Sequence, residues 1–407
     1  MFYLAGIIIT FFLSALLAGK KGKSYADKIL AIWLMVIGLH LLLFYLYKTG
    51  QYFNYPYLLG IDIPLPLMHG PFIYLYTISL TKTRRAMWSD LLHFTPVMIV
   101  YVLMLSFFQL SGEEKIYVYK NQGRGFEWLT DNLFYFILAS GIIYVVLSFL
   151  ELRKHKVNIE NQFSNTEKIN LNWLRYLIYG TSVIWLVIIA GFKDQYIFST
   201  VVLYVFFIGY FGIRQTGVFT NKKNRPQIQD LPSPVEDLLL DHVQEKQVEK
   251  VKEELKEEEA DVKVIQSTSD TNNAGVKIKY QKSSLNNETA LRIHDQLTGL
   301  MKEKKLFKDP DVNLGDLADQ LEIHANTLSQ VINSFEKKNF YDYINDMRVA
   351  EFKKMLIDPE NEKYTLLSLA FECGFNSKTA FNRNFKKATG QSPSEFFKNS
   401  KAEPRPI

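Results

Sequence analysis

The C-terminal fold is decided by the stretch Leu366–Phe397, LLSLAFECGFNSKTAFNRNFKKATGQSPSEFF. Leu366, Leu369 and Ala370 recur at the spacing of one face of a helix, so they predict a short amphipathic helix. Gly374 then breaks the pattern, as a tight turn between two helices requires.

A second, more polar helix is predicted after this turn. Asn376 or Ser377 can cap its N-terminus, Gly390 is a C-terminal stop, and Ser392-Pro393 can cap and begin a third helix. Its inward positions are Ala380, Phe381 and Phe385, and its outward positions are Lys378, Thr379, Asn382, Arg383, Lys386 and Lys387. The order of helix, turn and exposed helix is that of a helix-turn-helix motif.

The same plan occurs about fifty residues earlier. The apolar positions of this first motif are Leu314, Leu317, Ala318, Leu321, Leu328, Val331 and Ile332. Aligning Leu328 with Phe381 places Asn326, Ser329 and Gln330 opposite Thr379, Asn382 and Arg383. Between the motifs, the apolar residues of 340–356 recur at helical spacing and predict a rod roughly 25 Å long. Such a rod can hold two recognition helices near one turn of DNA apart, roughly 34 Å.

With this pattern, about the last hundred residues resemble the DNA-binding domain of AraC/XylS-type transcription regulators, most clearly in the run GFNSKTAFNRNFKKATGQSPSEF. The resemblance implies a seven-helix unit with two helix-turn-helix motifs, a bacterial source, and double-stranded DNA and RNA polymerase as partners. It also implies base-edge contacts from Asn326, Ser329, Gln330, Lys378, Thr379, Asn382 and Arg383, and phosphate contacts from Lys386 and Lys387.

The first motif departs from the family pattern at two turns. Glu322 stands where a turn glycine is usual, and Lys337 stands where the second motif has Gly390. Because positive φ is unfavourable for a residue with a Cβ, we expect these turns to be built differently. Asp316 and Asp319 also make this half acidic, so a protein-interaction module with a degenerate DNA-binding fold stays open as an alternative.

The composition argues against an enzyme. Cys373 is the single cysteine among 407 residues, which excludes an internal disulfide and a cysteine-based metal cluster; we expect it to be a small buried core residue. The sequence has no HExxH spacing, glycine-rich phosphate loop or nucleophile elbow, so we predict no catalytic residues, metal or cofactor. The net charge of +5 is too small to indicate nucleic acid by itself.

The first half of the chain contains apolar runs long enough to cross a bilayer, which needs roughly 20 residues for each span. The seven predicted spans are 2–18, 29–47, 57–80, 91–110, 132–150, 173–192 and 196–213. No basic segment precedes the first, which therefore reads as a retained span. The predicted domains are a seven-span transmembrane domain (1–215), a charged linker (216–287) and a double helix-turn-helix domain (288–400).

Basic residues concentrate in every second loop, and this pattern predicts the orientation of the spans in the membrane. They concentrate in the first, third and fifth loops and after the last span, at Lys20, Lys21, Lys23, Lys28, Lys82, Arg84, Arg85, Arg153, Lys154, Lys156, Lys168, Arg214, Lys222, Lys223 and Arg225. The sequence therefore predicts a multi-pass protein of the bacterial inner membrane, with its N-terminus outside and its C-terminal domain in the cytoplasm.

Polar residues within the spans are candidates for intramembrane sensing. His40, His69 and His93 are costly in hydrocarbon unless they face protein or water, and Asp62 precedes a proline series that should interrupt the third span. These residues either build a ligand-sensing cavity or are hydrogen-bond partners between helices. In the linker, the run VQEKQVEKVKEELKEEEADVKV fits a short coiled coil that joins two chains, a single helix, or a disordered segment.

Together these features predict an all-α protein: a membrane-anchored, sequence-specific DNA-binding transcription regulator. Its membrane bundle would be a sensor or a tether, with the lipid bilayer and a second copy of the chain as further partners. The signal ligand is left open. The alternative is a membrane transporter or membrane-embedded enzyme that carries a regulatory or protein-interaction tail.

Overall fold

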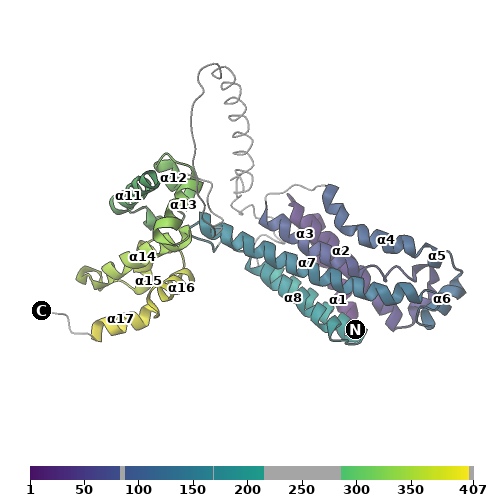
Figure 1. The fold of residues 1–407 in the computed structure, drawn as a ribbon. Helices are drawn as coiled ribbons and strands as arrows, with labels where there is room; N and C mark the ends of the chain where they lie inside the picture. The colour runs from purple at the N-terminus through teal and green to yellow at the C-terminus, as the bar shows by residue number, and fades with distance from the viewer. Residues whose placement is uncertain (83–87, 168, 215–285, 403–407) are drawn as a thin grey trace, which may run out of the picture. The chain divides into compact units, whose positions relative to one another are not determined.

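The computed structural model describes residues 1–82, 88–167, 169–214 and 286–402, and nearly all of the predicted linker lies outside them. Every regular element in these ranges is an α- or 3-10 helix (Figure 1), which confirms the predicted all-α fold. The chain divides into two compact units, residues 1–157 with 169–227 and residues 158–168 with 228–407.

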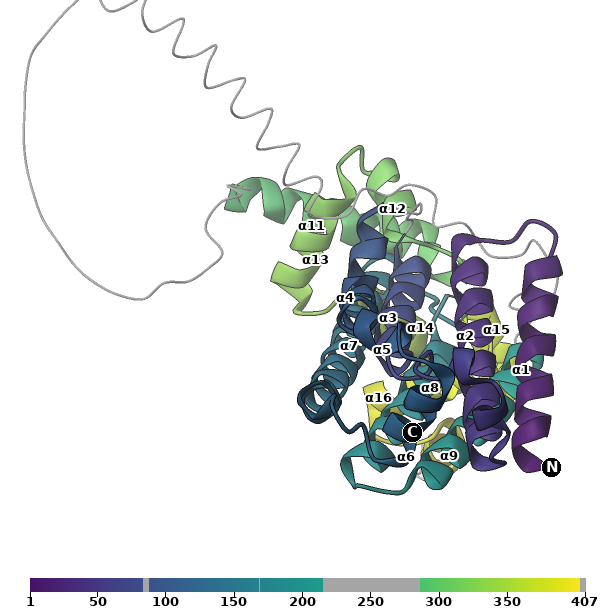
Figure 2. The ribbon, with the colours of Figure 1, turned by 90° about the vertical axis from the view of Figure 1, so that its right-hand side faces the viewer.

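The first unit is built from apolar helices. Figure 2 shows α1 and α2 side by side; α1 packs against α2 and α9, α8 packs against α9, and α3 packs against α2. Its described helices are α1 (Phe2–Gly19), α2 (Tyr25–Lys48), η1 (Gln51–Asn54), η2 (Pro56–Leu58), α3 (Pro66–Thr81), η3 (Trp88–Phe94), α4 (Thr95–Leu103), α5 (Leu105–Phe108), α6 (Gly112–Lys120), α7 (Glu127–Gln162), α8 (Asn172–Ile189) and α9 (Asp194–Arg214).

Five helices in the described residues, α1, α2, α7, α8 and α9, are long and apolar enough to cross a bilayer. The third and fourth predicted spans are different. Residues 57–65 form no α-helix, and α3 begins at Pro66, because proline lacks an N–H and fits the first helical position. The fourth run is divided into η3, α4 and α5. The predicted interruption of the third span by its prolines is therefore confirmed, whereas the fourth predicted span is not one continuous helix.

Apolar side chains lie both inside and outside the first unit. Leu30, Leu34 and Ile73 are fully buried in its core. In contrast, Ile8 on α1 and Leu186 on α8 are 60% and 62% exposed. A helix that is apolar all round is typical of a membrane span or of the core of a large protein.

The described residues 286–402 of the second unit contain seven α-helices, the number that the family resemblance implied. They are α11 (Asn287–Lys304), α12 (Leu314–Gln320), α13 (Ala325–Glu336), α14 (Phe340–Ile357), α15 (Leu366–Glu372), α16 (Lys378–Thr389) and α17 (Pro393–Ala402), with η4 (Leu306–Lys308) and η5 (Pro359–Asn361) between them.

α14 belongs to two hydrophobic cores. Near its N-terminus, Phe340 and Ile344 pack in the core formed with α11, α12 and α13. Farther along, Val349 and Phe352 pack in the core formed with α15 and α16. One continuous helix of 18 residues therefore fixes the position of each helix-turn-helix motif relative to the other.

Candidate nucleic-acid interface

The second helix-turn-helix motif is built from α15 and α16. The Ser377 hydroxyl accepts a hydrogen bond from the Ala380 amide at 3.0 Å, so Ser377 is the cap of α16 among the two predicted candidates. Gly374 has φ +94°, and a Cβ added there would lie 2.6 Å from the Phe307 carbonyl oxygen. Gly390 ends α16 in the left-handed region, with φ +77°.

The two faces of α16 differ in polarity as predicted. Ala380, Phe381 and Phe385 are buried in the core. The exposed side chains are Lys378, Thr379, Asn382, Arg383, Lys386 and Lys387, all six of the residues predicted to contact DNA from this motif. The exposed side therefore offers amide and hydroxyl groups that can read base edges and cations that can contact phosphates.

Two of these six side chains are held by α14. Arg383 Nη2 donates to the Tyr341 hydroxyl at 2.6 Å, and Lys387 Nζ forms an ion pair with Asp342 at 2.6 Å. The buried Asn384 Nδ2 also donates to the Tyr341 hydroxyl, at 2.7 Å. Tyr341 and Asn384 were not predicted from the sequence, although Asn384 falls on the buried stripe of α16.

The first motif presents a smaller polar surface. On α13, Asn326 and Gln330 are exposed, whereas Ser329 is only partly exposed and accepts a 3.4 Å hydrogen bond from Asn333 Nδ2. The Asp316 carboxylate is engaged in an intramolecular contact, because it and the Asn313 side chain cap α12 reciprocally.

The turns of the first motif follow the same path as those of the second, contrary to expectation. Glu322 has φ +55° and Lys337 has φ +56°, the left-handed region that Gly374 and Gly390 occupy in the second motif. The turn after α12 closes with a hydrogen bond from the Ile323 amide to a carbonyl of that helix at 3.0 Å. Closure by backbone hydrogen bonds and core packing offsets a strain of ~1–2 kcal/mol at a non-glycine residue.

Two helix-turn-helix motifs joined by a shared helix define a class of DNA-binding domain. Residues 317–399 match the family model described as "Helix-turn-helix domain". One curated relative, the HTH-type transcriptional activator RhaS of Pectobacterium atrosepticum, is 29% identical over 83 residues, which cover 20% of this chain and 29% of the relative. A protein of unknown function from Listeria innocua is 28% identical, covering 26% of this chain and 95% of that structure, with a TM-score of 0.23.

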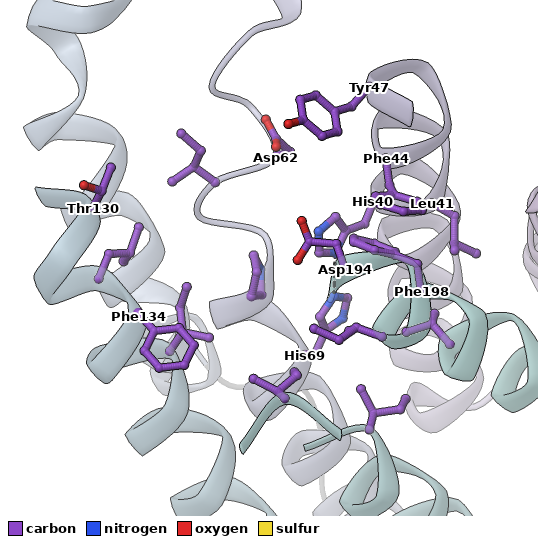
Figure 3. Close-up of a pocket in the computed structure, with 18 of the residues that line it drawn as sticks. His40, Leu41, Phe44, Tyr47, Asp62, His69, Thr130, Phe134, Asp194 and Phe198 are labelled. Carbon is purple, nitrogen blue, oxygen red and sulfur yellow. Dashed lines mark hydrogen bonds between the residues drawn. The ribbon is translucent and has the colours of Figure 1, made fainter. Parts of the chain in front are cut away.

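A separate cavity lies inside the first unit and is shown in Figure 3. Its volume is about 510 Å³, and its lining is largely apolar and aromatic. Among the residues predicted for sensing, His40, Asp62 and His69 line this cavity. His93 is not among the lining residues; its Nδ1 lies 3.0 Å from the Tyr144 hydroxyl.

A chain of hydrogen bonds fixes the two histidines of the cavity. Trp33 Nε1, which can only donate, lies 3.3 Å from His69 Nδ1, so that nitrogen accepts. In neutral His69 the proton is then on Nε2, which donates to His40 Nδ1 at 3.2 Å. His40 in turn carries its proton on Nε2, for which the described residues supply no hydrogen-bond partner. His40 Nε2 is therefore an N–H donor of the lining that has no partner among the described residues.

Asp62 is held by two tyrosines. Its Oδ1 accepts hydrogen bonds from the hydroxyls of Tyr52 at 2.8 Å and Tyr119 at 2.7 Å. Burial and the charge of Asp62 raise the pKa of both phenols, so both hydroxyls remain donors at neutral pH. This cluster ties the loop before α3 to α6.

Proposed function

We propose that this chain is a membrane-anchored, sequence-specific DNA-binding transcription regulator whose membrane bundle is a sensor or a tether. The observation that carries the proposal is the exposed basic and amide face of α16, within a region that matches the helix-turn-helix family. Double-stranded DNA is the partner of this face, and by analogy with the activator RhaS we propose contact with RNA polymerase as well.

The exposed side chains of α16 have different roles in this proposal. Lys378, Thr379 and Asn382 lie in its first two turns and would meet base edges in the major groove, while Lys386 would contact a phosphate. Arg383 is exposed beside them and donates to the Tyr341 hydroxyl, so a base contact through the same N–H group would replace that hydrogen bond.

The DNA-binding proposal is tested by selecting sequences from a random DNA library with the full chain in lipid nanodiscs. Asn382→Ala should weaken binding to the selected site by ~1–3 kcal/mol and relax preference at one position. Arg292→Ala removes an exposed charge from α11, outside both motifs, and should leave the preference unchanged. Recovery of no enriched sequence by the wild-type chain would contradict the proposal.

We also propose that the first unit crosses the membrane with its N-terminus outside and its C-terminal side in the cytoplasm. Contacts at the ends of the helices support this topology. Lys82, in a predicted cytoplasmic loop, forms an ion pair with Glu151 at 3.0 Å, and Tyr25 donates to Asp90 at 2.8 Å. These contacts bring predicted cytoplasmic loops to one end of the bundle.

The outer loops meet in the same way. The Tyr3 hydroxyl donates to the Gln195 carbonyl at 2.9 Å, and Tyr52 and Tyr119 share Asp62. The exposed apolar side chains between the two ends fit the lipid bilayer as a partner.

For the sensor, we propose that the cavity binds an apolar molecule with one hydrogen-bond acceptor. The volume lies in the range of ligand sites, the lining is mostly apolar, and His40 Nε2 is a donor without a partner in the described residues. A medium-chain methyl ketone should therefore raise the melting temperature of the full chain in nanodiscs more than the alkane of equal length. The difference should vanish in His40→Leu. Equal effects of ketone and alkane on the wild type would contradict this assignment.

A further inference from the structure

The second compact unit includes a short segment from the first half of the chain, residues 158–168, of which 158–167 are described. Phe163 forms an antiparallel bridge with Asn313, the residue that caps α12. The Ser164 amide and hydroxyl both donate to the Val312 carbonyl, at 3.4 and 2.6 Å. Ser164 is 1% exposed, so this segment is packed into the domain and not merely touching its surface.

Arg348 of α14 anchors the segment. This arginine is 2% exposed, and it donates to the carbonyl oxygens of Phe307 and Asp309, each at 2.7 Å. It also contacts the hydroxyl of Ser164 at 3.2 Å and its carbonyl at 3.5 Å. Asn345, likewise 2% exposed, donates to the same carbonyl at 3.0 Å.

A buried guanidinium needs acceptors for its N–H groups, because an unpaired buried charge is strongly unfavourable. The acceptors around Arg348 are neutral oxygens, and two of them belong to Ser164. Burial lowers the pKa of Arg348 to about 10, which leaves it charged at neutral pH. Arg348 and Asn345 therefore form a built receptor for one backbone carbonyl and one hydroxyl.

The end of the segment reaches the recognition helix. Ser377, the cap of α16, donates its hydroxyl proton to Glu167 Oε1 at 2.7 Å. Glu167 also lines a small pocket together with Tyr341 and Arg383, the exposed arginine that donates to the Tyr341 hydroxyl. The docked segment thus places a carboxylate at the N-terminus of the helix that would enter the major groove.

DNA phosphates and the Glu167 carboxylate would compete for the same position, because both are anions that are stabilised by a helix N-terminus and nearby cations. A carboxylate at this position also repels the phosphate backbone. On this basis, and resting on the DNA-binding function proposed above, we propose that residues 163–167 are an intramolecular ligand of the DNA-binding domain that lowers its affinity for DNA while docked.

Residues 163–167 follow directly on α7, one of the helices long and apolar enough to cross a bilayer. A change in the position of the end of α7 is therefore transmitted to the docked residues through the peptide chain. If about nine molecules in ten hold the segment docked, the apparent dissociation constant for DNA is raised about tenfold.

The test measures DNA affinity of the full chain in lipid nanodiscs, with the selected site as probe. Glu167→Ala removes the carboxylate at α16, and Glu303→Ala is its matched control, an exposed carboxylate of α11 in the same unit. Ser164→Leu prevents docking without changing charge, because its site is fully enclosed. We expect Glu167→Ala and Ser164→Leu to bind DNA about tenfold more tightly than the wild type, and Glu303→Ala to bind as the wild type does.

Hydrogen exchange of peptides covering 158–167 gives a second readout. Saturating DNA should accelerate exchange at Ser164 in the wild type, since ligands that compete displace each other reciprocally. Equal affinities of wild type, Glu167→Ala and Ser164→Leu, with unchanged exchange on DNA addition, would overturn the docking proposal while leaving DNA binding intact. Failure of all variants to bind any DNA would instead overturn the proposed function, and the docking proposal with it.

Discussion

Gly374→Ala and Gly390→Ala form a matched pair that tests how the second helix-turn-helix motif is held together. Both glycines follow a helix in the left-handed region, with φ +94° and +77°. A Cβ at Gly390 would have no neighbour within 4 Å, whereas a Cβ at Gly374 would lie 2.6 and 2.7 Å from the carbonyl oxygens of Phe307 and Lys308. The same substitution thus adds backbone strain alone at one site and strain with a clash at the other.

The magnitudes follow from these two geometries. Left-handed backbone at alanine costs ~1–2 kcal/mol, which is the whole expected effect of Gly390→Ala. Forcing the carbonyls away from Gly374 adds ~1–3 kcal/mol, because backbone atoms cannot rotate out of the way as a side chain can. We therefore expect Gly374→Ala to destabilise the motif by ~2–5 kcal/mol.

Cys373 supplies the assay, because it is the single cysteine and is fully buried in the core of this motif. Burial also raises the pKa of its thiol to about 12, so it reacts with a maleimide only when the motif opens. Labelling rates of the full chain in nanodiscs, each divided by the rate of the urea-unfolded chain, report the opening equilibrium.

The expected changes in labelling are large enough to separate the variants. Since 1.4 kcal/mol corresponds to a factor of ten, Gly390→Ala should label roughly 5- to 30-fold faster than the wild type. Gly374→Ala should label roughly 30-fold to several thousand-fold faster. If Gly374→Ala labels no faster than Gly390→Ala, the close approach of η4 to this turn does not limit stability and the reasoning is refuted.

Two further predictions concern membrane orientation and acid stability. In intact cells, a membrane-impermeant maleimide should label Asn121→Cys and reach Lys21→Cys only after permeabilisation; the reverse pattern would refute the proposed orientation. Burial alone would raise the pKa of Glu351, but its hydrogen bonds and ion pairs with two lysines outweigh burial and lower it. Its stabilising effect is therefore complete above its ordinary pKa of 4.5 and lost as pH falls through the lowered value. Between about pH 6 and about pH 3.5, calorimetry should show a larger fall in the melting temperature of the second unit for wild type than for Glu351→Gln, and equal falls would contradict this.

Local sequence patterns were sufficient for the helices of the two helix-turn-helix motifs and for α14 between them. The apolar spacing and the capping residues predicted α14 and α16, because caps and amphipathic stripes depend on residues three or four positions apart. The left-handed turns at Glu322 and Lys337 were not predicted, since their strain is offset by the packing of the folded motif, which no local pattern records.

The contacts between distant parts of the sequence were beyond local patterns as well. Tyr341 and Arg383 are 42 residues apart, and Ser164 and Arg348 are 184 apart. Nothing in the neighbourhood of either residue in the sequence indicates its partner. In the first unit, hydropathy predicted the five long helices and the proline series predicted the interruption of the third span, but neither showed that the fourth run divides into η3, α4 and α5.

The participation of α14 in two cores has a consequence for the spacing of a DNA site. Inserting one residue between Ile344 and Val349 would turn the second motif by about 100° relative to the first and move it about 1.5 Å along the helix. Inserting seven residues would nearly restore the facing and move the motif by about 10 Å, close to three base pairs. Under the proposed function, the separation between the two half-sites that one chain would read is thus set by the number of residues in α14, and only insertions close to whole turns would keep both motifs facing the same way.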